Sequence, residues 1–221
     1  MSTGFIERKI SKEKINKRKM LCGVGINDAP YVVHPMIDGK RVYCSCYLQW
    51  RNLIVGNYGK RAIASGDNCG VYSPWLRFSV FKEWMKQQDW KGMSLDKDII
   101  LPGNKMYGPD ICAFVSHRVN DLITPYAYRK LPRGVSYRSN DETYSIHVAY
   151  SEKYAYEKGA YMGGFKTVRK ASDCWLEYKE RTVVEVCTTL TDSRVIKGLM
   201  LHMELLKKES LNRVTAIEAE D

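Results

Sequence analysis

The stretch that decides the fold runs from Leu95 to Asn120 and reads LDKDIILPGNKMYGPDICAFVSHRVN. It predicts a short strand with acidic residues, a turn rich in Gly, Pro and Asn, and then a helix from residue 109 or 110 to 122. The first turns of that helix carry His117 and Asn120. A carboxylate on the strand at Asp96 and an amide on the helix at Asn120 can then meet at one divalent cation, which prefers oxygen ligands.

The charge of the chain favours an anionic partner. Lys and Arg number 35 against 25 Asp and Glu, which gives a net charge of +10 and a pI of about 9.2. This is the electrostatic pattern expected of a protein that binds phosphate groups. Residues 8–19 hold seven basic side chains, whereas the last four residues include three acids. Residues 1–21 therefore form a basic arm, suited either to nonspecific contact with a phosphate backbone or to a solvated, partly disordered terminus.

Length and cysteine use bound the class of protein. A chain of 221 residues can form one large or two small domains. No apolar run approaches the roughly 18 residues needed to span a bilayer, and the N-terminus lacks the apolar segment of a secretory signal. The seven cysteines include no Cys-x2-Cys pair. We therefore expect a soluble cytoplasmic protein with buried free thiols, and neither disulfides nor structural zinc.

Helical periodicity marks two further segments in the N-terminal half. Residues 47–55 and 78–85 each carry apolar residues three and four positions apart, which predicts two helices. Ser73 followed by Pro74 is a start signal for the second. The apolar residues of these helices are Leu48, Trp50, Leu53, Ile54, Phe78, Phe81, Trp84 and Met85. We expect the aromatic face to form core, with base stacking as the alternative.

The C-terminal half predicts a small sheet followed by helices. Residues 135–138, 144–150 and 160–165 alternate as strands, and a helix over about 171–183 would cover one face of their sheet. Residues 131–134 have the composition of a linker. A last helix from about residue 192 to 208 would act as a brace across the domains or as a dimer contact. The expected fold class is α+β.

The motif at residues 95–120 resembles the HNH motif of phage homing endonucleases. The matching positions are Asp96, Lys97, Asp98, Gly103, Asn104, Tyr107, Pro109, Cys112, Phe114, Val115 and Asn120. The resemblance covers residues 22–123 and implies a ββα-metal domain, which we place at 22–130. It also implies DNA phosphodiester cleavage with Mg²⁺ or Mn²⁺. By position, Asp96 and Asn120 are then the metal ligands, and Asn104 fixes the loop between them.

One position departs from the family pattern. The general-base histidine that normally follows the first acid is Lys97 here. A lysine between Asp96 and Asp98 should keep its proton and would be a poor base. His117 stands one helical turn before Asn120 and is the other candidate, although a helical histidine is also a common surface or capping group. The catalytic candidates are thus Lys97 and His117.

The segment from residue 131 to 187 resembles the AP2 domain that accompanies HNH modules in phage homing enzymes. The match rests on Gly134-Val135, Arg138, Tyr144, Ile146, Val148, Met162-Gly163, Phe165 and Thr167. Such domains lay their sheet in the major groove of DNA, where outward side chains read bases. The implied base contacts are Arg138, His147 and Tyr161, and the implied phosphate contacts are Lys153, Lys158 and Lys166. The loop over 151–159 either grips nucleic acid or is solvated.

Together these features predict a DNA-binding chain with a C-terminal helix and acidic tail at residues 188–221. The leading hypothesis is metal-dependent cleavage of double-stranded DNA at a site chosen by the AP2-like domain. The alternatives are a DNA-binding regulator that keeps the scaffold without the chemistry, and a protein-interaction factor. The resemblance places it in the cytoplasm of an infected bacterial host, with no membrane contact. A homodimer and a host or phage protein partner remain open.

Overall fold

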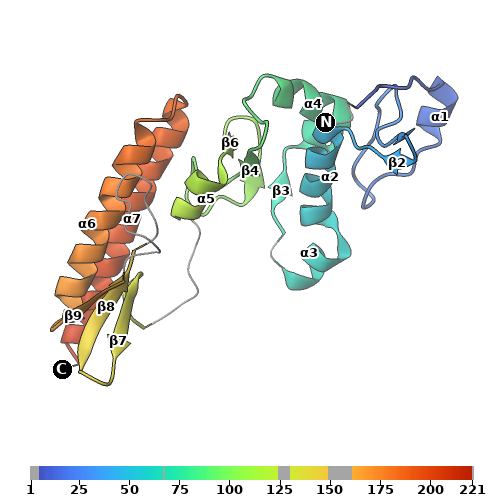
Figure 1. Cartoon of the computed structure of the whole chain (residues 1–221). Helices are drawn as coiled ribbons and strands as arrows, with labels where there is room; N and C mark the ends of the chain where they lie inside the picture. Colours follow the sequence, from blue (N-terminus) through green and yellow to red (C-terminus); the bar gives the residue numbers. More distant parts are fainter. Residues whose placement is uncertain (1–4, 67, 124–129, 149–160, 221) are drawn as a thin grey trace. The chain divides into compact units, whose positions relative to one another are not determined.

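The computed structural model describes residues 5–66, 68–123, 130–148 and 161–220. The chain is mixed α+β with small sheets. It separates into two compact units, Met1–His117 and Arg118–Asp221, and Figure 1 shows the elements of each. The division falls at His117, earlier than the boundary at residue 130 that the sequence suggests. Each unit is described by itself below.

Residues 5–21, which the sequence presents as a basic arm, belong to the first unit. The N–H of Ile10 donates to the carbonyl of Pro30 at 3.0 Å, and the short helix α1 (Lys12–Asn16) follows. The Arg18 guanidinium donates to the carbonyls of Ala29 and Tyr31, each at 2.8 Å. Because a guanidinium offers five donors in a rigid plane, it can hold several carbonyls of one loop at once. Ile10 and Arg18 therefore anchor this segment to the loop before the first hairpin.

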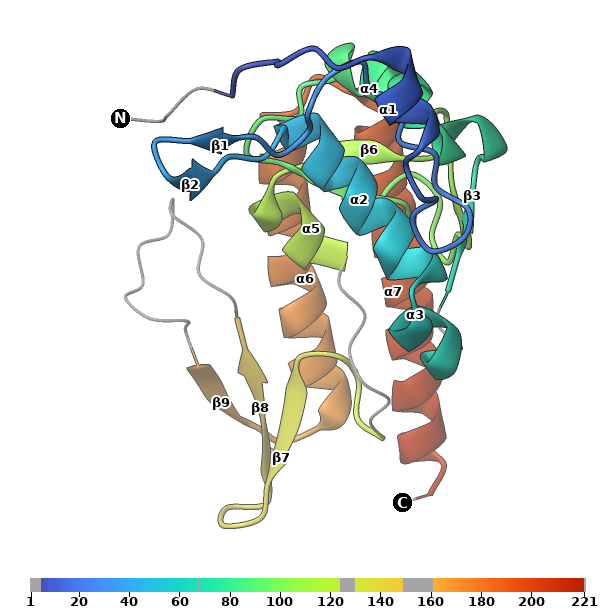
Figure 2. The same ribbon diagram turned by 90° about the vertical axis from the view of Figure 1, so that its right-hand side faces the viewer.

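The helices predicted over residues 47–55 and 78–85 are both present. A hairpin of β1 (Met36–Ile37) and β2 (Lys40–Arg41) precedes α2 (Ser45–Tyr58) and α3 (Lys60–Ser65), and Figure 2 shows α3 directly after α2. The start of the next helix differs from the prediction, because Ser73–Leu76 forms a 3-10 turn and α4 spans Phe78–Lys86. Asp28 supplies the cap, since its Oδ1 accepts the N–H of Ser79 at 2.9 Å.

The aromatic residues of these helices form the core of the first unit, as predicted. Trp50, Trp75, Phe78 and Phe81 each expose at most 1% of their surface. The Trp50 indole donates to the carbonyl of Trp75 at 2.7 Å, so the largest buried ring also satisfies its polar atom. The face of α4 is therefore core, and the base-stacking alternative is excluded for these side chains.

Two short strand pairs complete the first unit. β3 (Gly70–Val71) pairs in parallel with β5 (Met106–Tyr107), and β4 (Ser94–Asp96) pairs antiparallel with β6 (Ala113–Val115). The predicted helix from residue 109 or 110 is therefore wrong over its first part, and α5 spans His117–Ile123. All three residues of β6 are buried. A continuous buried run suits a strand covered on both faces, and Phe and Val favour that state.

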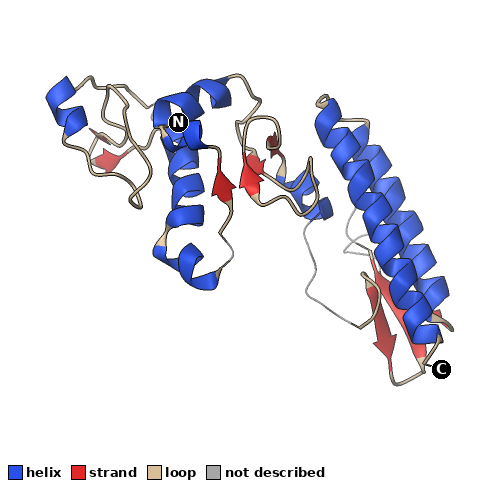
Figure 3. Ribbon diagram, turned by 180° about the vertical axis from the view of Figure 1, so that it is seen from behind, coloured by secondary structure: helices blue, strands red, loops and turns tan. Residues whose placement is uncertain are grey.

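The second unit is a three-stranded antiparallel sheet with two long helices (Figure 3). The strands are β7 (Val135–Arg138), β8 (Thr143–His147) and β9 (Tyr161–Phe165), in that order. All three predicted strands are present in the described residues. Helix α6 (Val168–Cys187) contacts every strand of the sheet, and its Trp175 indole donates to the carbonyl of His147 at 3.1 Å.

The last helix is longer than predicted. Helix α7 spans Ser193–Glu218 and lies beside α6. Val214 and Ile217, beyond the predicted end near residue 208, are buried. Glu218 accepts a hydrogen bond from Nε of Arg169 on α6 at 2.9 Å. Part of the expected acidic tail is thus helical and paired.

No helix in the described part of the chain combines the length and the apolar content needed to cross a lipid bilayer.

Candidate metal and nucleic-acid site

Asp96 ends β4 and turns the chain into the loop that follows. Its Oδ1 accepts the backbone N–H groups of Asp98 at 2.8 Å and Ile99 at 2.6 Å. Burial raises the pKa of the Asp96 carboxyl, and the two backbone N–H groups oppose that shift. Both hydrogen bonds use one oxygen, so Asp96 supports the turn and still has Oδ2 to offer.

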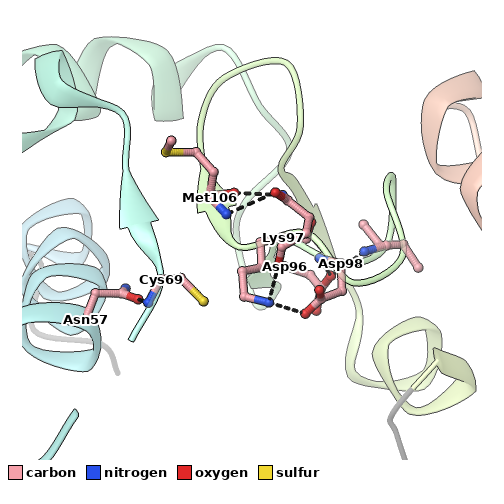
Figure 4. Close-up of polar contacts among 8 residues, drawn as sticks. Asn57, Cys69, Asp96, Lys97, Asp98 and Met106 are labelled. Atoms are coloured by element: carbon pink, nitrogen blue, oxygen red, sulfur yellow. Dashed lines mark hydrogen bonds and ion pairs between the residues drawn. The ribbon is translucent and has the colours of Figure 1, made fainter. Parts of the chain in front are cut away.

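Lys97 is held by oxygen atoms on two sides (Figure 4). Its ammonium lies 2.5 Å from Oδ2 of Asp98 and donates to the carbonyl of Asn104 at 2.9 Å. The side chain is only 15% exposed. An ammonium has no lone pair with which to accept a proton, and this one is engaged by two oxygen atoms. This geometry does not suit Lys97 to the role of general base, for which the sequence offered Lys97 and His117 as candidates.

Asn104 ties the two ends of the loop together. Its Nδ2 donates to the carbonyls of Lys97 at 2.9 Å and Met106 at 2.7 Å, and its Oδ1 accepts the N–H of Met106 at 2.9 Å. The residue is 9% exposed. Three bonds from one buried amide set the path of the chain between β4 and β5. The sequence assigned a loop-structuring role to this residue.

The far side of the loop is anchored by neutral, buried groups. Cys112 is fully buried, and its sulfur accepts the N–H of Gly108 at 3.3 Å. Burial raises the pKa of the Cys112 thiol to about 12. On the side of β3, Asn57 of α2 accepts the backbone N–H of Cys69, the residue before that strand, at 3.0 Å (Figure 4). The Cys112 thiol thus supports the loop as an uncharged group, in keeping with the expectation of free buried cysteines.

The two predicted metal ligands lie in different units. Asp96 belongs to the first unit, and Asn120, half-buried on α5, belongs to the second. Their meeting at one ion therefore stays a prediction. His117 is the exposed first residue of α5 and the last of the first unit. Among the residues described, no three His, Cys, Asp or Glu side chains gather in a group able to hold a metal.

The residues around Asp96 fit Mg²⁺ better than Zn²⁺. Mg²⁺ keeps several waters and is commonly held by one or two carboxylates together with substrate phosphates, so a single carboxylate oxygen such as Oδ2 of Asp96 is a workable protein ligand. A Zn²⁺ site would instead need three or four nitrogen or sulfur ligands. The predicted Mg²⁺ or Mn²⁺ is therefore compatible with the donor atoms present.

The sheet of the second unit carries a row of polar residues on one face. Val135 pairs with Ile146 on the other face, and both are buried. Because successive side chains alternate, Ser136, Arg138 and His147 share the polar face and are exposed, whereas Thr143 and Ser145 on the same face are buried. The Arg138 side chain is 41% exposed and lies 3.5 Å from Asp141. The structure thus brings Arg138 and His147, two predicted DNA contacts, to one face.

The remaining predicted contacts are placed only in part. Lys166 follows β9 and is exposed. Tyr161 pairs with His147 through its backbone, while its side chain lies outside the description. Lys153 and Lys158 also lie outside the described residues. The phosphate contacts proposed for that loop therefore stay predictions.

Lys179 has a shifted pKa that was not expected from the sequence. Burial on α6, followed by the positive charge of Arg133, lowers the pKa of Lys179 to about 8. Lys179 stands four residues from both Trp175 and Val183, which are buried on the same helix. A lysine within an apolar i, i+4 stripe is a signal that the sequence does contain.

Comparisons of the chain with protein-family models, with curated proteins and with solved structures found no match.

Proposed function

We propose that this protein binds double-stranded DNA through the polar face of the β7–β8–β9 sheet and cleaves its backbone with Mg²⁺ at Asp96. The observation that carries the cleavage part is the position of Asp96. It ends the first of two antiparallel strands, the second strand leads into α5, and one carboxylate oxygen remains after the turn is satisfied. This order of elements is the one expected of an HNH-type metal site.

Asp96 and Asn120 would hold the ion, and His117 would be the candidate base in place of Lys97. When bound, Mg²⁺ supplies stabilisation of the negative charge that develops on the leaving oxygen. Asp96 contributes the anionic ligand, and Asn104 keeps the loop in place. Support for the DNA-binding part comes from the net charge of +10 and from the exposure of Arg138 and His147 on one sheet face.

A plasmid nicking assay tests cleavage, with Mg²⁺, Mn²⁺ or EDTA present. Asp96→Asn is the informative variant, because an amide oxygen can still accept the two backbone N–H groups while the anionic ligand is lost. We expect this variant to keep its fold and to lose nicking. Asp96→Ala should lose nicking and also about 1–2 kcal/mol of stability, because the turn loses its acceptor. Asp89→Asn, at an exposed acid of the same unit, is the control and should cleave normally.

A second candidate function is DNA binding without cleavage. The ion pair that occupies Lys97 favours it, since the residue in the base position is already committed to Asp98. Salt-dependent binding with no nicking under any metal would select this candidate. Nicking that survives both Asp96→Asn and Asn120→Ala would refute the assignment of the metal ligands.

Binding is tested by fluorescence anisotropy on a duplex at several salt concentrations. If Arg138 reads a base, Arg138→Ala should cost about 1–3 kcal/mol on the preferred site, whereas Lys166→Ala should reduce the salt slope by about 1. The matched control is Arg181→Ala, because Arg181 also lies in the second unit and pairs with an acid one turn away. Equal losses for Arg138→Ala and Arg181→Ala would remove the sheet face as the reading surface.

A further inference from the structure

A pair of thiols at the start of α2 lies outside the site described above. Cys44 is the residue before the first turn of α2, and Cys46 is in that turn. Both belong to the first unit and are buried, at 5% and 8% exposure. Tyr31 and Lys82 surround them. Neither thiol has a role in the metal or DNA site.

A chain of hydrogen bonds connects Lys82 to the sulfur of Cys44. The Lys82 ammonium donates to the Tyr31 hydroxyl at 2.7 Å and to Glu7 at 2.9 Å. The Tyr31 hydroxyl lies 3.8 Å from Sγ of Cys44. An ammonium only donates, so the Tyr31 oxygen is the acceptor there and its single proton is available for the sulfur. The positive charge of Lys82 thereby strengthens a donor aimed at Cys44.

Two neighbouring groups also lower the pKa of Cys44. The thiol of Cys46 has the largest effect in lowering the pKa of Cys44, and the backbone N–H of Tyr47 lowers it further, against the effect of burial. The N–H of Tyr47 belongs to the first turn of α2, where N–H groups lack intrahelical partners. The contact does not complete a cap hydrogen bond. A neutral thiol is a weak acceptor, whereas a thiolate is stabilised by a donor such as the Tyr31 hydroxyl.

The charged groups nearby support the same assignment. The positive charge of Lys82 lowers the pKa of both thiols, and Lys86 acts in the same direction on Cys46. The pKa of Cys46 is nevertheless raised, first by its hydrogen bond to Cys44 and then by burial. Cys44, which the chain from Lys82 through Tyr31 reaches, is thus the sulfur favoured to lose its proton first. Glu7 is drawn to Lys82 and is the one acid in this chain of contacts.

We propose that Cys44 and Cys46 form a redox-active dithiol that a small hydroperoxide oxidises to an intramolecular disulfide. A small oxidant is specified because both sulfurs are buried. Two residues apart, their Cα atoms are separated by at most about 7 Å, which overlaps the range a disulfide spans. Cys44 has an extended backbone, with ψ 117°, and so is not confined to the helical geometry of Cys46.

The reaction balances in two steps. The Cys44 thiolate attacks one peroxide oxygen, so that an S–O bond forms, the O–O bond breaks, and the leaving oxygen takes a proton to become an alcohol or water. The Cys46 sulfur then attacks the sulfur of the Cys44 sulfenic acid. The S–S bond forms, the S–O bond breaks, and the hydroxide that leaves combines with the thiol proton of Cys46 to give water. The dithiol loses two electrons, and the peroxide gains the same two electrons.

The sequence offers a direct readout. Trypsin cleaves after Arg41 and Arg51, so both thiols lie on one peptide, residues 42–51, with no other cysteine. The intact protein is treated with limiting hydrogen peroxide, then alkylated, digested and analysed by mass spectrometry. We expect peptide 42–51 to lose two hydrogen atoms before the peptides that carry Cys22 and Cys174 are modified. In Cys46→Ser, the reaction should stop at a sulfenic acid on Cys44 that dimedone traps.

Two variants separate this site from ordinary buried cysteines. Lys82→Met and Tyr31→Phe remove the donor chain and should slow oxidation of peptide 42–51 about tenfold at about pH 5. That pH lies below the pKa of Cys44, which is lowered to about 6, so a pKa higher by about one lowers the thiolate fraction by that factor. Lys91→Met, at an exposed lysine, is the matched control and should react at the wild-type rate. Circular dichroism checks that each variant folds.

The proposal is overturned if peptide 42–51 stays reduced while the peptides of Cys22 or Cys174 are oxidised. It is equally overturned if oxidation of that peptide proceeds at the same rate in Lys82→Met, Tyr31→Phe and Lys91→Met. Because the wild-type time course and the lysine variants need no change at either cysteine, the test stands even if a cysteine variant fails to fold.

Discussion

Replacing Asn104 should lower the free energy of unfolding of the first unit more than a substitution of similar size at an exposed position. Its amide makes three hydrogen bonds, to the carbonyls of Lys97 and Met106 and from the N–H of Met106. In Asn104→Ala these three backbone groups lose their partner in a position that is 9% exposed. At about 1 kcal/mol for each bond, with a larger cost for groups left unpaired, we expect a loss of about 3 kcal/mol in the free energy of unfolding.

The assay is urea unfolding followed by tryptophan fluorescence. Four of the five tryptophans lie in the first unit, so the signal reports mainly on the unit that contains Asn104. Asn52→Ala is the matched control, because Asn52 is exposed on α2, and it should change the free energy by less than about 0.5 kcal/mol.

A second substitution at Asn104 separates the contribution of its Nδ2 donor from that of its Oδ1 acceptor. Asn104→Asp keeps an oxygen for the N–H of Met106 but turns a carboxylate toward two carbonyls, which should raise the pKa of the introduced group above about 3.9. The folded state then binds the proton more tightly than the unfolded state. The loss of stability should be largest at neutral pH and should shrink as the pH falls toward that raised pKa. Equal stability of Asn104→Ala and Asn52→Ala would refute the role of the amide.

Two further predictions concern the second unit. Gly134→Ala should cost more than about 3 kcal/mol of stability, because the φ of +77° at Gly134 disfavours a side chain and an added Cβ would collide with the Trp175 indole. Gly164→Ala is the control. Gly164 has a φ of +84° with open space around it, so its substitution should cost only the backbone strain of about 1–2 kcal/mol. Asp192→Asn tests a charge at the start of α7, where hydrogen bonds from Arg194 hold the pKa of Asp192 below its usual range. A lowered pKa contributes stability at neutral pH that is lost as the pH falls through the folded pKa, so the difference between Asp192→Asn and wild type should shrink below about pH 4. Urea unfolding followed by circular dichroism measures the stability of each variant. A Gly134→Ala protein as stable as Gly164→Ala would contradict the first prediction. A stability difference between Asp192→Asn and wild type that does not change with pH would contradict the second.

Local periodicity was enough to predict most of the regular elements. Helical spacing marked α2, α4 and the first part of α7, and strand alternation marked β7, β8 and β9. The burial of Trp50 and Phe81 followed from the same spacing. These features depend on neighbours within one or two turns of the chain, which a short window of sequence contains.

The segment at residues 113–115 shows where that information ends. Ala113-Phe114-Val115 fits a buried helix or a buried strand by composition, and only pairing with β4 selects the strand. In the same way, α4 begins where Asp28, far earlier in the chain, caps it. A short apolar run does not specify its partner, so its state is decided by the tertiary structure.

The basic charge, the short acidic motif around Asp96 and the residue types that a metal or DNA site would need could all be read from the sequence. What these residues do locally became known with the fold: Asp96 supports a turn with one oxygen, Lys97 is paired with Asp98, and Arg138 shares a face with His147. The sequence could not give these roles, because protonation and hydrogen bonding depend on burial and on partners brought near by folding.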